Sequence, residues 1–151
     1  MKAPSRSSWL TALALVPVLL APVAGESTAI AGGHRSRTCD LDGVWRNGDR
    51  GTTNNFTVSG LLTRNADGSA NFTGQYQDGT EEATIDGVAR SGAWNFTVNF
   101  TSGMIKMANG PEQETGAANQ FLVEGVYTTL VDGRDANRSG SFTLSGTCAR
   151  N

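Results

Sequence analysis

Strict alternation of apolar and polar residues is the dominant pattern in this chain. In residues 93–101, Trp94, Phe96, Val98 and Phe100 share one face, and Asn or Thr residues take the other. Because successive side chains of a strand point to opposite faces, a period of two predicts half-buried strands. Further strands are predicted at 54–62, 70–77, 120–131 and 141–147, and with a weaker pattern at 41–47, 83–90 and 104–108.

Turn residues separate these segments. Asp67-Gly68, Asp78-Gly79 and Ser91-Gly92 stand between successive strands, where tight hairpins favour Gly and Asx. A longer hairpin loop is predicted at residues 132–140. The longest connection is predicted at residues 102–119, and it is either a binding lid or a disordered segment. Seven or eight short antiparallel strands joined in this way predict an all-β protein, built as an up-and-down barrel or a sandwich.

The two cysteines, Cys39 and Cys148, lie at opposite ends of the strand-forming region. An even pair in an exported protein predicts a disulfide, and two free thiols are the alternative. A disulfide needs the two Cα atoms within about 7 Å of each other. We therefore expect the first and last strands to be neighbours, which favours a closed barrel of seven or eight strands over a sandwich.

The N-terminal segment has the pattern of a secretory signal peptide. Lys2 and Arg6 precede an apolar run from Trp9 to Leu20, and small residues follow. The run is shorter than the roughly 20 apolar residues of a spanning helix, although an uncleaved anchor is the alternative. We expect a signal peptide at 1–31, a flexible lead-in at 32–38 and a barrel domain at 39–151, in a secreted or periplasmic protein without a membrane span.

Charge and residue types narrow the range of functions. The chain has 12 basic and 14 acidic residues, so it lacks the basic surplus of a nucleic-acid binder. Its single histidine, His34, lies in the expected lead-in, which does not hold an imidazole for Ser-His-Asp or Cys-His catalysis. No His/Cys zinc spacing, phosphate loop or dinucleotide motif is present. The sequence predicts no catalytic residue, no metal site and no cofactor.

Three further features of the sequence contain residue types that are used in catalysis or metal binding. Lys106 is the only lysine after the signal peptide, and a Schiff-base role is one option for it, although it falls in the expected long connection. The carboxylate pairs Glu81-Glu82 and Asp132/Asp135 are expected to be solvated turn residues. Residues 132–137 contain calcium-loop residue types without the order of an EF-hand.

Five Asn-x-Ser/Thr sequons are present, at Asn55, Asn71, Asn95, Asn99 and Asn137. Four of them read Asn-Phe-Thr within predicted strands. They are glycosylation candidates in a eukaryotic secretory pathway. The alternative is that alternation alone produces the motif, with Asn and Thr on the wet face of a strand and Phe on the dry face.

Short motifs resemble the avidins, a family of small calycin-type barrels. Gly43-Val44-Trp45-Arg46-Asn47 is similar to the first avidin strand, Phe72-Thr73-Gly74-Gln75-Tyr76 to the third, and 94–100 to the fifth. The resemblance implies an antiparallel barrel with a biotin-like ligand. Asn47 and Tyr76 would bond its ureido group, and Trp45 and Trp94 would line the pocket. In calycins a basic residue from the chain end often packs over the first-strand tryptophan, which implies Arg150 here. The avidin tryptophan that caps a neighbouring subunit has no counterpart.

The function expected from these observations is a secreted, non-enzymatic β-barrel that binds a small ligand in its open end. Two alternatives stay open. One is a protein-binding module, an inhibitor or effector, that acts through residues 102–119. The other is a structural surface protein whose barrel is filled with side chains. The sequence does not indicate the oligomeric state.

Overall fold

The computed structural model describes residues 35–150 except residue 80 and residues 132–133, and it leaves out the side chains of 134–137. The predicted signal peptide, His34 and the side chain of Asn137 therefore lie outside the described residues. Among those described, no helix has the length and apolar character needed to cross a membrane. The strands are β1 (Arg35–Asn47), β2 (Thr53–Arg64), β3 (Ala70–Gln77), β4 (Glu82–Arg90), β5 (Ala93–Phe100), β6 (Met104–Pro111), β7 (Gln120–Val131) and β8 (Arg134–Arg150).

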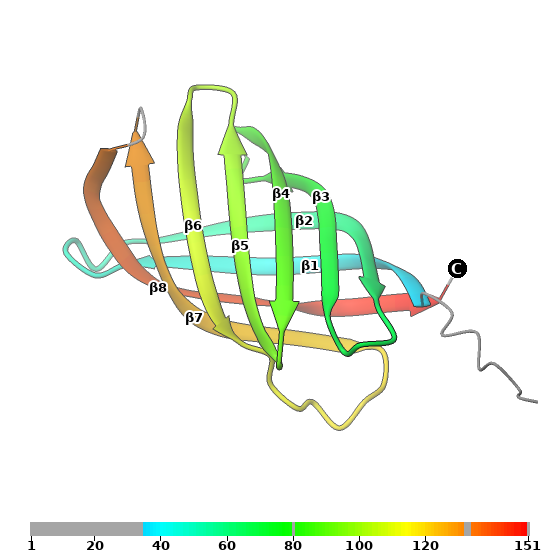
Figure 1. Ribbon diagram of the computed structural model, residues 1–151. Coiled ribbons are helices and arrows are strands. Elements are labelled where there is room, and N and C mark those ends of the chain that lie inside the picture. Colours follow the sequence, from blue (N-terminus) through cyan, green and yellow to red (C-terminus); the bar gives the residue numbers. More distant parts are fainter. Residues whose placement is uncertain (1–34, 80, 132–133, 151) are drawn as a thin grey trace, which may run out of the picture. The chain divides into compact units, whose positions relative to one another are not determined.

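The strands form a closed barrel in which each strand pairs antiparallel with its neighbours in sequence, and β1 pairs with β8 to complete the ring (Figure 1). This confirms the predicted all-β up-and-down barrel. The predicted turn glycines are also confirmed, because Gly68, Gly79 and Gly92 have φ angles of 81°, 87° and 77°. Glycine adopts this left-handed region without the steric penalty that a Cβ atom brings.

The predicted disulfide joins the two strands that close the barrel. Cys39 on β1 is the direct cross-strand partner of Cys148 on β8, with Cα atoms 4.0 Å apart and a sequence separation of 109 residues. Both cysteines are buried. The covalent bond therefore fastens the barrel at its seam, close to the ends of β1 and β8 that carry the chain termini.

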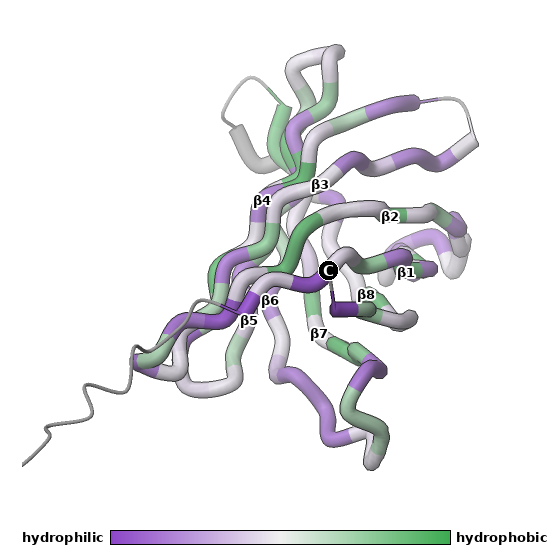
Figure 2. The backbone as a smooth tube through the Cα atoms, turned by 90° about the vertical axis from the view of Figure 1, so that its right-hand side faces the viewer, coloured by the Kyte–Doolittle hydropathy of each residue, from purple (hydrophilic) through white to green (hydrophobic). Residues whose placement is uncertain are grey.

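The alternating pattern fills the barrel interior with aromatic rings. Along the strands, hydrophilic and hydrophobic positions follow each other as bands of colour (Figure 2). Trp45 stacks on Phe56 with ring centroids 4.7 Å apart, and it also contacts Phe142 at 5.6 Å. Phe142 in turn contacts Phe96, which stacks on Trp94 at 5.1 Å. The aromatic residues of the part of the chain that the structure describes are all buried; they are Trp45, Phe56, Phe72, Tyr76, Trp94, Phe96, Phe100, Phe121, Tyr127 and Phe142.

Gly43 shows why a glycine precedes the first-strand tryptophan. It faces the interior two residues before Trp45, and Phe56 is its cross-strand partner. The Phe56 ring lies so close that a Cβ atom on residue 43 would be 2.0 Å from its Cζ atom. The glycine therefore creates the space in which the Phe56 ring lies against the Trp45 ring.

Three segment boundaries differ from the predicted ones. β1 begins at Arg35, inside the predicted lead-in, because residues 35–38 pair with β2. The predicted loop at 132–140 is wrong, since β8 already begins at Arg134 and pairs with β7 through a register shift. The predicted connection at 102–119 contains β6, which confirms the eighth strand and shortens the loop to 112–119. Backbone N–H and C=O groups form these ladders, so pairing extends into segments without alternation.

Candidate functional site

The candidate site is a cavity of about 460 Å³ at the barrel end where Asn47 terminates β1. We call it the Lys106 mouth. Every strand except β3, β4 and β5 supplies part of its lining, and the β1–β2, β3–β4 and β5–β6 connections supply the rest. The lining residues are Trp45, Asn47, Thr52, Asn54, Asp78, Glu81, Ser102, Met104, Lys106, Tyr127, Thr129, Val131 and Arg138.

Lys106 is the unusual residue of this mouth. It lies on β6 with its side chain only 9% exposed, and it is the one charged residue found buried in the described part of the chain. Its Nζ atom is 5.0 Å from the centroid of the Trp45 ring and 5.1 Å from that of Phe100. An ammonium group over an aromatic face is attracted by the ring quadrupole, and desolvation strengthens this attraction.

The Lys106 amine has neither a salt bridge nor a hydrogen bond within the described residues. Burial is the largest influence on it and lowers the pKa of Lys106 below its ordinary value of 10.5. The carboxylates of Asp78 and Glu81 act in the opposite direction, and the Arg138 guanidinium lowers the pKa further. Lys106 is largely removed from water and forms no salt bridge or hydrogen bond within the described residues, so a ligand that accepts a hydrogen bond or carries negative charge would stabilise its charged form.

A hydrogen-bonded chain runs from Trp45 to the β3–β4 turn. The Trp45 Nε1–H donates to the Tyr76 hydroxyl at 2.9 Å, and that hydroxyl donates to Asp78 Oδ2 at 3.1 Å. The other carboxylate oxygen of Asp78 accepts from the backbone N–H of Glu81 at 3.1 Å. Burial raises the pKa of the Tyr76 phenol above its ordinary value, so this group stays protonated as a donor. The chain fixes the Trp45 ring beneath the cavity.

Asn47 lines the same mouth, but its side-chain carbonyl has local partners. Asn47 Oδ1 accepts hydrogen bonds from the backbone N–H groups of Asp49, at 3.0 Å, and Arg50, at 3.3 Å. This is an Asx turn that shapes the β1–β2 connection. Asn47 thus orders the rim of the mouth through its oxygen atom.

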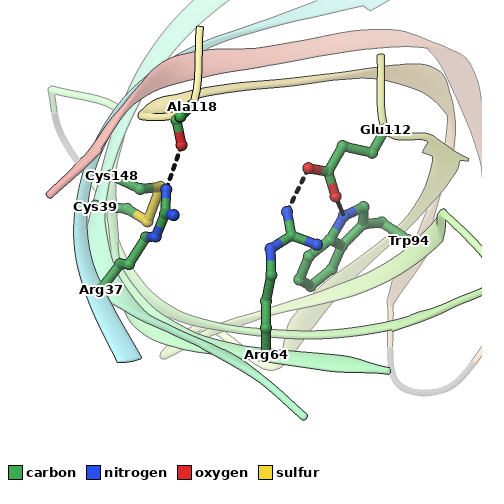
Figure 3. The surroundings of a disulfide bond; sticks show 7 residues. All are labelled: Arg37, Cys39, Arg64, Trp94, Glu112, Ala118 and Cys148. Atoms are coloured by element: carbon green, nitrogen blue, oxygen red, sulfur yellow. Dashed lines mark hydrogen bonds and ion pairs between the residues drawn. A yellow bond between two sulfur atoms is a disulfide. The ribbon is translucent and has the colours of Figure 1, made fainter. Parts of the chain in front are cut away.

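The opposite end of the barrel contains a second buried tryptophan with a different partner. The Trp94 Nε1–H donates to Glu112 Oε2 at 2.9 Å, and Glu112 Oε1 is bound by the Arg64 guanidinium (Figure 3). Arg37 donates to the backbone carbonyl of Ala118, which ties the 112–119 loop to β1 (Figure 3). We call this region, a depression of about 670 Å³ beside the disulfide, the Glu112 end.

The structure brings three of the four predicted ligand-binding residues together. Trp45 and Asn47 line the Lys106 mouth, and Tyr76 lies directly behind Trp45 through their hydrogen bond. Trp94 instead belongs to the Glu112 end. Arg150 does not lie over Trp45, because the β1–β8 register pairs it with Arg37. The cation over Trp45 is Lys106.

Sequence reasoning missed Lys106 as a lining residue. It is flanked by Ile105 and Met107, so the alternation rule would turn the two apolar residues inward and the lysine outward. The structure has the reverse arrangement, with Met107 51% exposed. The inward position of Ala108, two residues further along, was the available signal for the register of β6.

The glycosylation candidates with described side chains all lie on the outer wall. Asn55, Asn71, Asn95 and Asn99 are exposed, and the Phe that follows each Asn is buried. This geometry fits both interpretations of the sequons. Within the described residues, no group of three or more His, Cys, Asp or Glu side chains is arranged to hold a metal ion.

The two barrel ends therefore differ in chemistry. The Lys106 mouth offers an aromatic floor, an amine that forms no hydrogen bond or salt bridge with the residues the structure describes, and a rim with both carboxylates and a guanidinium. The closed eight-stranded barrel is compatible with the avidin-like resemblance, which rests on its short motifs alone. No protein-family model, no curated protein and no solved structure matches this chain.

Proposed function

We propose that this protein is a secreted, non-enzymatic β-barrel that binds a small ring-containing ligand in the Lys106 mouth. The observation that carries the proposal is the cavity of about 460 Å³ with the unpartnered Lys106 amine beside an aromatic floor. Ligand sites in proteins are concave, are lined largely by apolar and aromatic side chains and contain a few converging polar groups. The Lys106 mouth is concave, contains Trp45 and Tyr127 as aromatic lining residues and has several converging polar groups, which make up most of its lining.

The ligand is expected to place a ring near Trp45 and a polar or anionic group near Lys106. The mouth holds two carboxylates, Asp78 and Glu81, and two cations, Lys106 and Arg138. Asp78 accepts hydrogen bonds from Tyr76 and Glu81, whereas Lys106 lacks such partners. An acceptor group on the ligand therefore gains most at Lys106, because the amine forms no hydrogen bond within the described residues and can donate a charge-assisted one.

Biotin is the specific candidate, on the basis of the motif resemblance and the position of Trp45, Asn47 and Tyr76 at one end of the barrel. Secretion is part of the proposal, supported by the N-terminal pattern and by a disulfide of the kind found in exported proteins. The glycosylation candidates on the outer wall stay compatible with it.

Isothermal titration calorimetry with biotin and with uncharged biotinamide tests the candidate. We expect biotin to release heat and the Lys106→Met variant to bind it at least about tenfold more weakly, as the loss of one charge-assisted hydrogen bond implies. Arg64→Gln, at the Glu112 end, is the matched control and should bind like the wild type. Absence of heat at about millimolar biotin removes this ligand.

A filled structural barrel is the second candidate, and one observation favours it. The aromatic contacts from Trp45 through Phe142 and Phe96 to Trp94 fill the midsection between the two ends. Under this alternative the Lys106 mouth is a solvated rim with no ligand. A screen of small ring-bearing acids and amides by NMR separates the two candidates, since a filled structural barrel predicts no resonance shifts around Trp45.

A further inference from the structure

Lys106 combines three properties that a binding role alone does not require. Lys106 is only 9% exposed, its side chain lines a cavity at the barrel end, and it forms no salt bridge within the described residues. Lysines that form imines with carbonyl compounds are activated by such desolvation, because only the neutral amine has a free lone pair. The lowered pKa of Lys106 has the same direction, because it raises the neutral fraction of the amine at a given pH.

We propose that the Lys106 amine captures a small aromatic or conjugated aldehyde as an imine inside the barrel mouth. This inference rests on the proposed function in one respect: the Lys106 mouth must admit a small molecule. Trp45, which lines the mouth and whose ring centroid lies 5.0 Å from Nζ, offers an aromatic surface against which a planar conjugated group can pack. This geometry selects flat aldehydes over branched ones.

The capture is balanced without any oxidant or reductant. The Nζ lone pair attacks the carbonyl carbon, and the carbonyl oxygen takes up a proton to give a carbinolamine. The nitrogen then loses its remaining proton, the hydroxyl group leaves as water and the C=N bond forms. One amine and one aldehyde thus give one imine and one water, and hydrolysis reverses the step.

Ionisable groups suited to the proton transfers surround the amine. Asp78 and Glu81 reach the mouth from the β3–β4 connection, Tyr127 from β7 and Arg138 from β8. Asp78 and Glu81 interact electrostatically with Lys106, and a carboxylate of this kind can carry a proton from nitrogen to oxygen. The released water leaves through the cavity opening.

Reductive trapping tests the proposal directly. Full-length protein at about neutral pH is mixed with cinnamaldehyde and cyanoborohydride, which reduces an imine to a stable secondary amine. Peptide mapping by mass spectrometry then follows the gain of one aldehyde, less one water and plus two hydrogens, at Lys106. We expect labelling at least about tenfold faster than that of added N-acetyl-lysine, as the proximity of a bound reactant provides.

A position-shifted lysine is the matched control. The double variant Lys106→Arg/Met107→Lys keeps one lysine on β6 but places it on the outer wall, where residue 107 is 51% exposed. This lysine should label at the rate of N-acetyl-lysine, and so should Lys106 in wild-type protein unfolded by urea. The urea sample requires no variant to fold.

The outcomes separate this proposal from the proposed function. Labelling of folded wild-type Lys106 no faster than the reference amine overturns imine capture, whatever the variants do. If biotin or another ring-bearing ligand still binds by calorimetry, the proposed function stands without it. Fast, site-specific trapping supports imine capture even where biotin produces no heat.

Discussion

Each end of the barrel contains a buried tryptophan beside a charged residue, but only one of these charges is neutralised within the described residues. At the Glu112 end the carboxylate accepts from the Trp94 indole and from Arg64, and the 112–119 loop is fastened to β1. At the Lys106 mouth the amine lies over the Trp45 ring without a salt bridge or hydrogen bond. A charge that is paired within the protein stabilises the fold, whereas a charge without such a partner can still pair with a ligand.

The largest effect on stability is expected from the disulfide that joins β1 to β8 beside the Glu112 end. Replacing both cysteines, in Cys39→Ala/Cys148→Ala, should lower the free energy of unfolding by about 2–5 kcal/mol, because the bridge closes a long loop in the unfolded chain. Urea denaturation measures this loss. Unchanged stability in the variant would show that the β1–β8 pairing alone holds the barrel closed.

Glu112→Ala should destabilise the protein by about 1–3 kcal/mol, since it leaves the buried Trp94 indole N–H without an acceptor. Glu112→Gln is the matched control, because its amide oxygen can still accept from the indole. Thermal denaturation of the two variants separates the hydrogen bond from the ion pair with Arg64. Equal losses in both variants would contradict the assignment of the effect to the indole.

Lys106→Met should have the opposite sign and stabilise the ligand-free protein by about 1–2 kcal/mol, because a buried charge is replaced by an apolar side chain of similar length. Urea denaturation detects the gain, and Met107→Lys, on the outer wall, is the control that should change stability little. A destabilised Lys106→Met variant would mean that the amine contributes more to the fold than it costs.

The smallest expected effect is a change with pH in the free energy of unfolding, caused by Lys106. The pKa of Lys106 is lower in the folded protein than its ordinary value of 10.5, so the unfolded chain binds more protons between these two values. Stability must therefore rise with pH across this window. Tyr76 acts in the opposite direction only above its ordinary pKa of 10.0, because its folded pKa is raised.

Urea denaturation from about pH 7 to about pH 9, compared between wild type and Lys106→Met, isolates the lysine contribution, since the phenols stay largely protonated there and are common to both proteins. We expect the stability advantage of Lys106→Met over the wild type to shrink as the pH rises. A stability difference between Lys106→Met and the wild type that stays constant across this range would show that the Lys106 amine is solvated in the folded protein.

The barrel and its aromatic core could be predicted from the sequence because alternation sets which face of a strand is buried. Phe56, Tyr76 and Trp94 all follow this rule. The disulfide could be predicted because its geometry demands adjacent strands, and Cys39 and Cys148 are direct partners.

The site was predicted less completely, because its decisive residues break the alternation rule. Lys106 points inward between two apolar neighbours, and Glu112 reaches the interior from a loop. Trp45 is the third residue from the end of β1 and Trp94 is the second residue of β5, and because these two strands run in the same direction the tryptophans lie at opposite ends of the barrel. Local pattern does not encode which end of a barrel a residue reaches, since that depends on the register of all eight strands.

The indole N–H signals of Trp45 and Trp94, assigned with phenylalanine variants in 15N-labelled protein, give the most direct test of the difference between the two ends. The titration uses biotin, cinnamaldehyde and a set of small ring-bearing acids. We predict that a ligand shifts the Trp45 signal and leaves the Trp94 signal in place, because within the described residues the Lys106 amine has no hydrogen bond or salt bridge, whereas the Trp94 indole and Glu112 are paired. Shifts at Trp94 alone, or at neither indole with any of these compounds, would contradict the account.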